Sequence, residues 1–304
     1  MITGRSESLL LSNLGWVDRG SIWLHDTETG MTSRIAIGEG DFVRLHRGRD
    51  DLFAAALVRG HGQPWISVTI RRASAPTEVV GQWKFGDERA EGDATAWTLV
   101  PHVFVGYDPT QKDYVTILID PTDRTVNVQS VEWFDETYDW GYQQPMTVTA
   151  VPGTELLLYS VQRSSQLVLY DPRTGRVERK ITLAGRHGNP EPVFRTSTPE
   201  VWVSDYDHLV RLQPRTWEIL DAKRLQFTSE GSRLFIGDFA FDARERRCAV
   251  ARPFLGDAIV LDANSFTPIG EVMLGGQPLD IALLTDGRVF TRDWTAGELR
   301  TGRI

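Results

Sequence analysis

Short apolar runs separated by turn residues follow one another along the whole chain. The runs are four to seven residues long, rich in Val, Ile, Leu and Trp, and bounded by Gly, Pro, Asp and Ser, a composition typical of β-strands. No stretch of useful length shows the 3.6-residue period of an amphipathic helix. The pattern predicts an all-β protein in which any helix is a short connector.

A longer unit built from these runs recurs along the chain. Its clearest copy is Glu155–Leu183, ELLLYSVQRSSQLVLYDPRTGRVERKITL, and the copies start at Ser8, Leu52, His102, Glu155, Glu200, Arg247 and Arg288. The starts lie about 41 to 53 residues apart, close to the period of roughly 40–50 residues of a four-stranded propeller blade. The repeat predicts a single β-propeller domain over residues 1–304, with seven blades.

The number of strands and the two ends of the chain refine this prediction. We count about 26 strands, whereas seven full blades need roughly 28, so six blades is the alternative. Closing the ring requires the terminal strands to share a blade, which leaves no exposed strand edge. We therefore expect Glu7–Asn13 and Glu298–Ile304 to lie close together in one blade.

The segment DPRTG at residues 171–175 has the composition of a hairpin turn. Asp bonds the backbone that follows it, Pro presets φ, and Gly takes the left-handed conformation. Related turns occupy the same place in three other copies, at His25–Gly30, Ile119–Arg124 and Leu261–Phe266. We expect Asp171 and its equivalents to be structural rather than catalytic.

One stretch of the chain resembles a known class of propellers. In Ala258–Trp294, AIVLDANSFTPIGEVMLGGQPLDIALLTDGRVFTRDW, a strand, an Asp-based turn, a second strand, Gly-x-Pro, an inner strand and Asp-Gly follow in order. The stretch resembles the YVTN-type and quinoprotein-amine-dehydrogenase-like β-propellers. The tetrad YVTN itself is absent, and its place is taken by RVFTRDW and EVWVSDY. The Gly-His and Trp-Asp marks of WD40 proteins are missing from their usual places. The resembled superfamily includes dehydrogenase subunits, lactonases, lyases and scaffolds, so the resemblance implies a fold and leaves the function open.

Composition excludes several classes of function. The net charge is −8 and the arginines are scattered, which argues against a nucleic-acid partner. No apolar run approaches the roughly 18 residues of a membrane helix, so we expect no membrane association. The N-terminus lacks the apolar core of a secretory signal, which predicts a cytoplasmic protein, with a processed periplasmic protein as the alternative. The single cysteine, Cys248, is interpreted as a buried structural thiol.

The loops fall on two faces because successive strands alternate in direction. One face carries a clear excess of acidic residues, and we call it the acidic face. It comprises residues 38–41, 86–93, 134–144, 184–191, 227–238 and 275–280, with the loops inside each copy such as Ser204–His208. The other face carries the Asp-based turns and is about neutral. Because a charge asymmetry of this kind selects ligands, the acidic face is the predicted working face.

Aromatic and acidic side chains on the acidic face are the binding candidates. The long loop Phe134–Gln144 has the features of an ordered binding loop. The candidate ligand-binding residues are Asp135, Glu136, Trp140, Tyr142, Tyr206 and Trp294. Aromatic walls beside carboxylates suit a cation, an amine or a sugar. Packing between blades is the alternative role for each aromatic residue.

Polar residues also stand just before the predicted inner strands, where they would ring the mouth of a central channel. They are Asp41, Asp93, Gln144, Glu191, Asp238 and Gln277. Oxygen ligands of this kind hold Ca²⁺ or Mg²⁺, and Asp41, Asp93, Glu191 and Asp238 are the metal candidates. The alternative is that they cap strand entries in a water-filled channel.

Two histidines supply candidate catalytic bases. His187 and His61 lie in glycine-flanked loops of the acidic face, where a substrate can reach them. The sequence lacks HExxH, CxxC, GxSxG, P-loop and GxGxxG motifs, so the usual support for zinc proteases, α/β-hydrolases and nucleotide enzymes is absent. Two hypotheses follow. The first is a scaffold or binding propeller that engages a small ligand or a protein through its acidic face. The second is a metal-assisted lactonase, lyase or hydrolase.

Overall fold

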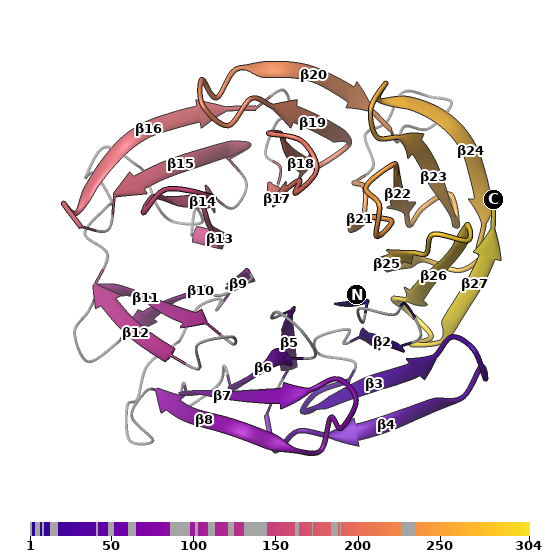
Figure 1. Cartoon of the computed structure of the whole chain (residues 1–304), viewed down its shortest axis with the longest axis horizontal. Coiled ribbons are helices and arrows are strands. Elements are labelled where there is room, and N and C mark those ends of the chain that lie inside the picture. Colours follow the sequence, from indigo (N-terminus) through magenta and orange to yellow (C-terminus); the bar gives the residue numbers. More distant parts are fainter. Residues whose placement is uncertain are drawn as a thin grey trace. The chain divides into compact units, whose positions relative to one another are not determined.

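The structure is a computed structural model, and every regular element in its described part is a β-strand (Figure 1). It describes residues 2–3, 7, 9–12, 18–40, 42–47, 52–59, 65–85, 98–100, 103–108, 113–120, 125–130, 145–161, 164–171, 173–183, 188, 190–225 and 235–304. These residues form 27 strands in seven antiparallel sheets. Within this part of the chain, no helix is long and apolar enough to cross a membrane.

The chain divides into two compact units, residues 2–181 and residues 182–304. In the first unit, four sheets each contain four strands that follow one another in sequence. They are β1 (Ile2–Thr3), β2 (Leu9–Ser12), β3 (Ser21–Asp26) and β4 (Thr32–Ala36); β5 (Phe42–Arg47), β6 (Leu52–Arg59), β7 (Trp65–Arg72) and β8 (Val79–Phe85); β9 (Thr98–Val100), β10 (Val103–Asp108), β11 (Asp113–Asp120) and β12 (Thr125–Ser130); and β13 (Pro145–Ala150), β14 (Leu157–Val161), β15 (Gln166–Asp171) and β16 (Arg176–Thr182).

The second unit contains three sheets. They are β17 (Glu191–Phe194), β18 (Val201–Asp205), β19 (His208–Leu212) and β20 (Ile219–Arg224); β21 (Phe239–Phe241), β22 (Arg247–Arg252), β23 (Asp257–Asp262) and β24 (Thr267–Met273); and β25 (Pro278–Leu283), β26 (Arg288–Asp293) and β27 (Leu299–Arg303). The first strands, β17, β21 and β25, lie on one side of this unit, and β20, β24 and β27 lie on the opposite side (Figure 1).

The middle strands of these sheets are buried on both faces, which explains why their sequences are apolar runs. In β22, Cys248 and Val250 join a core with Trp202 of the preceding sheet. The alternate residues Ala249 and Ala251 join a second core with β25 and β26. Because successive side chains point to opposite faces of a strand, one sheet contributes to two cores.

The Asp-based turns have the structural role that the sequence predicts. In the turn after β15, Oδ1 of Asp171 accepts the N–H groups of Arg173 (2.8 Å) and Thr174 (3.4 Å). Gly175 donates its N–H to the carbonyl of Asp171 and has a φ of 68°. The buried Cys248 is equally structural, as predicted, because burial raises the pKa of its thiol well above the usual range.

The last sheet differs from the other six because its described part has three strands instead of four. The N-terminal strands β1 and β2 pair with each other and then with β3, whereas the C-terminal strand β27 pairs with β26. The described strand pairings therefore do not include one between the two terminal segments, which we expected to share a blade. The described strand count lies between the 26 counted in the sequence and a full set for seven blades.

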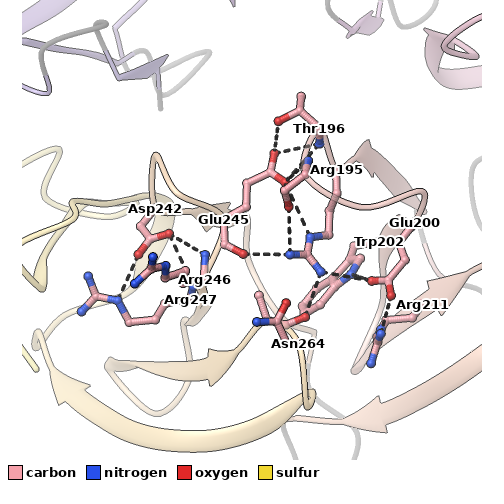
Figure 2. Close-up of polar contacts among 12 residues, drawn as sticks. Arg195, Thr196, Glu200, Trp202, Arg211, Asp242, Glu245, Arg246, Arg247 and Asn264 are labelled. Carbon is pink, nitrogen blue, oxygen red and sulfur yellow. Dashed lines mark hydrogen bonds and ion pairs between the residues drawn. The ribbon is translucent and has the colours of Figure 1, made fainter.

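A partly buried polar network joins the sheet β17–β20 to the sheet β21–β24 (Figure 2). Arg195 follows β17 and donates to the main-chain oxygens of Ala263 (2.9 Å) and Glu245 (2.8 Å). The carboxylate of Glu245 in turn accepts the N–H and hydroxyl groups of Thr196 and Ser197. Burial raises the pKa of Glu245, but these donors outweigh it and hold the pKa below its usual range.

The same network continues into the interior of the sheet β17–β20. Glu200 accepts from the indole N–H of Trp202 (3.0 Å) and from Arg211 (2.5 Å). The guanidinium groups of Arg195 and Arg211 lie 5.8 and 5.7 Å from the centroid of the Trp202 ring. These contacts are intramolecular and centre on the buried side chains of Arg195 and Trp202, so the network holds two sheets together.

Candidate functional site

Most of the side chains proposed from the sequence fall on residues that the structure does not describe. The two candidate bases, His187 and His61, lie outside the described residues, as do Asp135, Glu136, Trp140, Tyr142, Asp41 and Asp93. Their roles stay predictions. Tyr206, Trp294, Glu191 and Asp238 are described, and all four belong to the second unit.

Tyr206 and Trp294 approach the same short segment at the start of the sheet β21–β24. Tyr206 has a φ of 57° in the turn after β18, and its carbonyl accepts the N–H of Ile236 at 2.6 Å. The ring of the adjacent Phe235 lies 6.2 Å from the ring of Trp294, measured between centroids. The structure thus brings two predicted residues into contact with residues 235–236.

A further aromatic residue, which sequence reasoning did not single out, contacts this segment. Phe235 and Phe254 make an edge-to-face contact at 5.0 Å between centroids. Phe254, Leu255 and Trp294 are 49, 43 and 45% exposed. We call Phe235, Phe254, Leu255 and Trp294 the aromatic patch. Its members come from three segments of the chain that span 59 residues, so only the packing of neighbouring sheets reveals it.

Backbone hydrogen bonds fix the turns that present the aromatic patch. Leu255 and Gly256 donate to the carbonyl of Arg252, and Gly256 accepts the N–H groups of Leu274 and Gly275. The N–H of Trp294 bonds the carbonyl of Gln277 at 2.9 Å. The patch therefore has a fixed backbone, which lowers the entropy lost when a partner binds.

A carboxylate beside the patch holds one of these turns in place. Asp293 ends β26, and its Oδ1 accepts the N–H groups of Thr295 and Ala296, both at 2.9 Å. Its Oδ2 bonds Arg300 Nε at 2.9 Å and the N–H of Gln277 at 3.3 Å. Burial raises the pKa of Asp293, but these hydrogen bonds outweigh it and lower the pKa to about 2. Asp293 is therefore ionised and structural.

A glycine is required where this carboxylate meets the backbone. A Cβ on Gly276 would lie 1.6 Å from Oδ2 of Asp293, and a Cβ on Gly188 would lie 1.7 Å from Oδ1 of Asp205. In both cases a Gly-x-Pro segment precedes the aspartate by 17 residues. Sequence reasoning treated Gly-x-Pro as part of a family resemblance and missed this contact, although the equal spacing was a readable signal.

The turn after β18 contains a second ion-paired carboxylate. Asp207 is fully buried, and its oxygens bond Nδ1 of His208 and Nε of Arg224, both at 2.7 Å. Its carbonyl accepts the N–H of Leu225. The acidic residues of the SDYDH loop therefore shape the turn, which reduces the negative charge that this loop offers to a ligand.

Two carboxylates act on a third at the first strands of the second unit. Glu191 begins β17, Asp238 precedes β21, and Asp280 lies in β25. Burial raises the pKa of Asp238 to about 7, and the charges of Glu191 and Asp280 act in the same direction. We call Glu191, Asp238 and Asp280 the acidic cluster. Glu191 and Asp238 were predicted to lie near each other, whereas Asp280 was not proposed.

The acidic cluster does not by itself make a metal centre. In the described ranges, no three or more His, Cys, Asp and Glu side chains are placed to hold a metal ion. Asp41 and Asp93, the other two residues proposed for Ca²⁺ or Mg²⁺, lie outside those ranges. The proposed metal ligands therefore stay a prediction.

Comparison with solved structures decides the architecture. The chain matches the β-propeller domain of Cps50 (Swd1) from Myceliophteria thermophila with a TM-score of 0.69 and 14% identity, over 100% of this chain and 95% of that domain. The fold is a β-propeller. A chain of the mitotic checkpoint complex matches this propeller with a TM-score of 0.66 and 9% identity, over 98% of this chain and 85% of the other.

Sequence comparisons assign the propeller to no narrower group. No family model matches it, and no curated protein does. At 14% and 9% identity, the structural matches show the fold alone. The resemblance to the YVTN-type propellers is therefore confirmed only as far as the propeller fold.

Proposed function

We propose that residues 1–304 form a single scaffold propeller that binds a protein partner through the aromatic patch on its acidic face. The observation that carries this proposal is the exposure of Phe254 and Trp294, which are the exposed aromatic residues among the large apolar side chains of the described part. Aromatic side chains are enriched in protein interfaces, where a few of them supply most of the binding energy.

The geometry of the patch fits a protein segment better than a small ligand. Its rings meet edge to face, and the side chains of Phe254 and Trp294 are exposed, so they form an exposed apolar surface. Small ligands generally bind in concave sites that bury most of their surface. A flat apolar contact with fixed backbone is instead the usual centre of a protein interface.

The charges near the patch define the partner further. The acidic cluster adds negative charge at the first strands of the same unit, and Glu191 is exposed. A segment that combines an apolar anchor with a nearby lysine or arginine complements both features. Among the residues that the structure describes, the metal-assisted hydrolase has no comparable observation in its favour.

A peptide-display experiment tests the proposal. A random dodecapeptide library is selected on the purified chain, and the selected peptides are measured against the double variant F254S/W294S. The matched control is I219S/L220S, which removes two apolar side chains of similar exposure, 43 and 51%, from β20. Because truncating two interface anchors removes about 2 kcal/mol or more, the patch variant is expected to bind at least about 30-fold more weakly.

The control decides the interpretation. The I219S/L220S variant is expected to bind the same peptides within about twofold, and E191Q is expected to weaken only peptides that carry Lys or Arg. Selected peptides that bind the patch variant and the native chain equally well, or that respond as strongly to the control, contradict the proposal. Selected peptides without an apolar residue contradict it as well.

A further inference from the structure

The outer edge of the last sheet exposes backbone hydrogen-bonding groups. At one end of β27, the carbonyl of Glu298 accepts the N–H of Asp293, and at the other, Ile304 donates to the carbonyl of Gly287. Because backbone groups in an antiparallel strand alternate between its two sides, the even-numbered residues bond β26. The N–H and C=O groups of Leu299, Thr301 and Arg303 therefore point away from β26.

The equivalent edge is covered in every other described sheet. The third strands β15, β19 and β23 are each followed by a fourth strand, and their side chains are largely buried. In β27, by contrast, Thr301 and Arg303 are exposed, and none of the described strands pairs with its outer side. An uncovered strand edge is a template for an added strand.

The charges on β27 select an acidic strand. Arg303 lies directly opposite Arg288, in a pair of the type that brings side chains closest, and like charges in this position repel. Asp286 bonds the side chain of Arg288 through its carboxylate (2.7 Å) and the side chain of Arg303 through its main-chain oxygen (3.3 Å). The charge of Arg303 also acts on the same carboxylate and lowers its pKa, so two arginines share one carboxylate. A carboxylate on an added strand would offset this repulsion.

We propose that β27 is a docking edge at which an extended acidic segment of a partner protein adds as the fourth strand of the sheet. The segment runs antiparallel to β27, bonds the backbone of Leu299, Thr301 and Arg303, and places a carboxylate next to Arg303. A second copy of this chain is a poorer occupant because its own β27 would bring another Arg300 and Arg303 to the interface. This edge is separate from the aromatic patch, so the two proposals fail independently.

Hydrogen exchange on the purified chain tests whether the edge is open. The amides of Thr301 and Arg303 are expected to exchange at rates near those of an unstructured peptide, whereas the amides of Gly302 and Ile304 are expected to be protected. Protection of Thr301 and Arg303 in the monomeric chain would overturn the proposal, because another segment of this chain would then cover the edge.

Peptide display tests the occupant. A random octapeptide library is selected on the chain, and binding is compared between T301P and T301V. Proline removes the outward N–H of residue 301 and leaves the bonds to β26 in place, whereas valine changes only the side chain. Acidic peptides are expected to bind T301P at least tenfold more weakly, to bind T301V within twofold, and to bind R303Q several-fold more weakly. The patch variant F254S/W294S is expected to bind them normally.

The remaining outcomes overturn the proposal. They are a library that yields no peptide sensitive to T301P, selected peptides without acidic residues, and a chain that is dimeric by light scattering and becomes monomeric on T301P. The last outcome would identify a second copy as the occupant. If T301P lowers the melting temperature by more than about 3 °C, Arg303→Pro replaces it, because that N–H also points outward.

Discussion

The substitution D238N is expected to make the propeller more stable above neutral pH. Asp238 lies between β22 and β25, where its N–H bonds the carbonyl of Leu279 and its carbonyl accepts from Ala251. Its Oδ1 accepts the N–H of Phe239 at 2.8 Å. Asparagine keeps this acceptor and removes the charge, so the substitution isolates the electrostatic contribution.

The magnitude follows from the pKa of Asp238. Burial raises this pKa from 3.8 to about 7, and a tenfold change in proton affinity corresponds to about 1.4 kcal/mol. The folded state therefore binds a proton more tightly than the unfolded state. Well below pH 3.8 the group is protonated in both states, so it does not affect stability. Between pH 4 and pH 7 the native chain loses stability, and above pH 7 the loss is complete, at up to about 4 kcal/mol.

The assay is urea unfolding of the native chain and D238N at pH 4, 5.5, 7 and 8.5. Because Asp238 is only half-buried by its exposed area, we expect a difference of about 1–3 kcal/mol at pH 8.5 and at most about 0.5 kcal/mol at pH 4. The control E191Q removes a neighbouring charge, and it is expected to give a smaller gain in the same pH range. A D238N variant that is less stable at pH 8.5, or whose gain does not change with pH, would refute the reasoning.

Three further predictions concern the glycine contact, the polar network around Arg195 and the thiol. G276A is expected to destabilise the chain by more than about 2 kcal/mol, because its Cβ would meet Asp293 at 1.6 Å. G30A, with a similar φ of 72° and nothing within 4 Å, is expected to cost only about 1 kcal/mol; equal losses would contradict this. R195M is expected to lower the free energy of unfolding by about 3 kcal/mol or more, and a loss below 1 kcal/mol would show that the network contributes little. The thiol of Cys248 is expected to react with a disulfide reagent only after unfolding, and rapid reaction of the native chain would show that it is accessible.

Local sequence patterns predict much of the fold because its strands and turns are local. Asp171, Pro172 and Gly175 lie within five residues of one another, so the turn can be read directly. The apolar runs likewise give the strands, since a middle strand covered on both faces has no polar side. The period of the repeat then gives the propeller fold that the structural comparison supports.

The candidate site depends on contacts that no local pattern contains. Phe235 meets Trp294 across 59 residues, and Arg195 meets Glu245 across 50. Acidic residues on the predicted working face also proved ambiguous, because Asp207 and Asp293 are neutralised by arginines and hold turns. A count of charges in loops cannot separate such residues from Glu191, which is exposed.

The double role of β22 has a consequence for how such a chain evolves. Val250 packs with Trp202 of the sheet before it, whereas the adjacent residue Ala251 packs with Ile281 of the sheet after it. A change of side-chain volume at one of these positions is compensated within one core and leaves the other core untouched. Substitutions can therefore accumulate in neighbouring pairs of sheets independently of the rest, and propellers can retain one architecture while sharing as little as 9% of their residues.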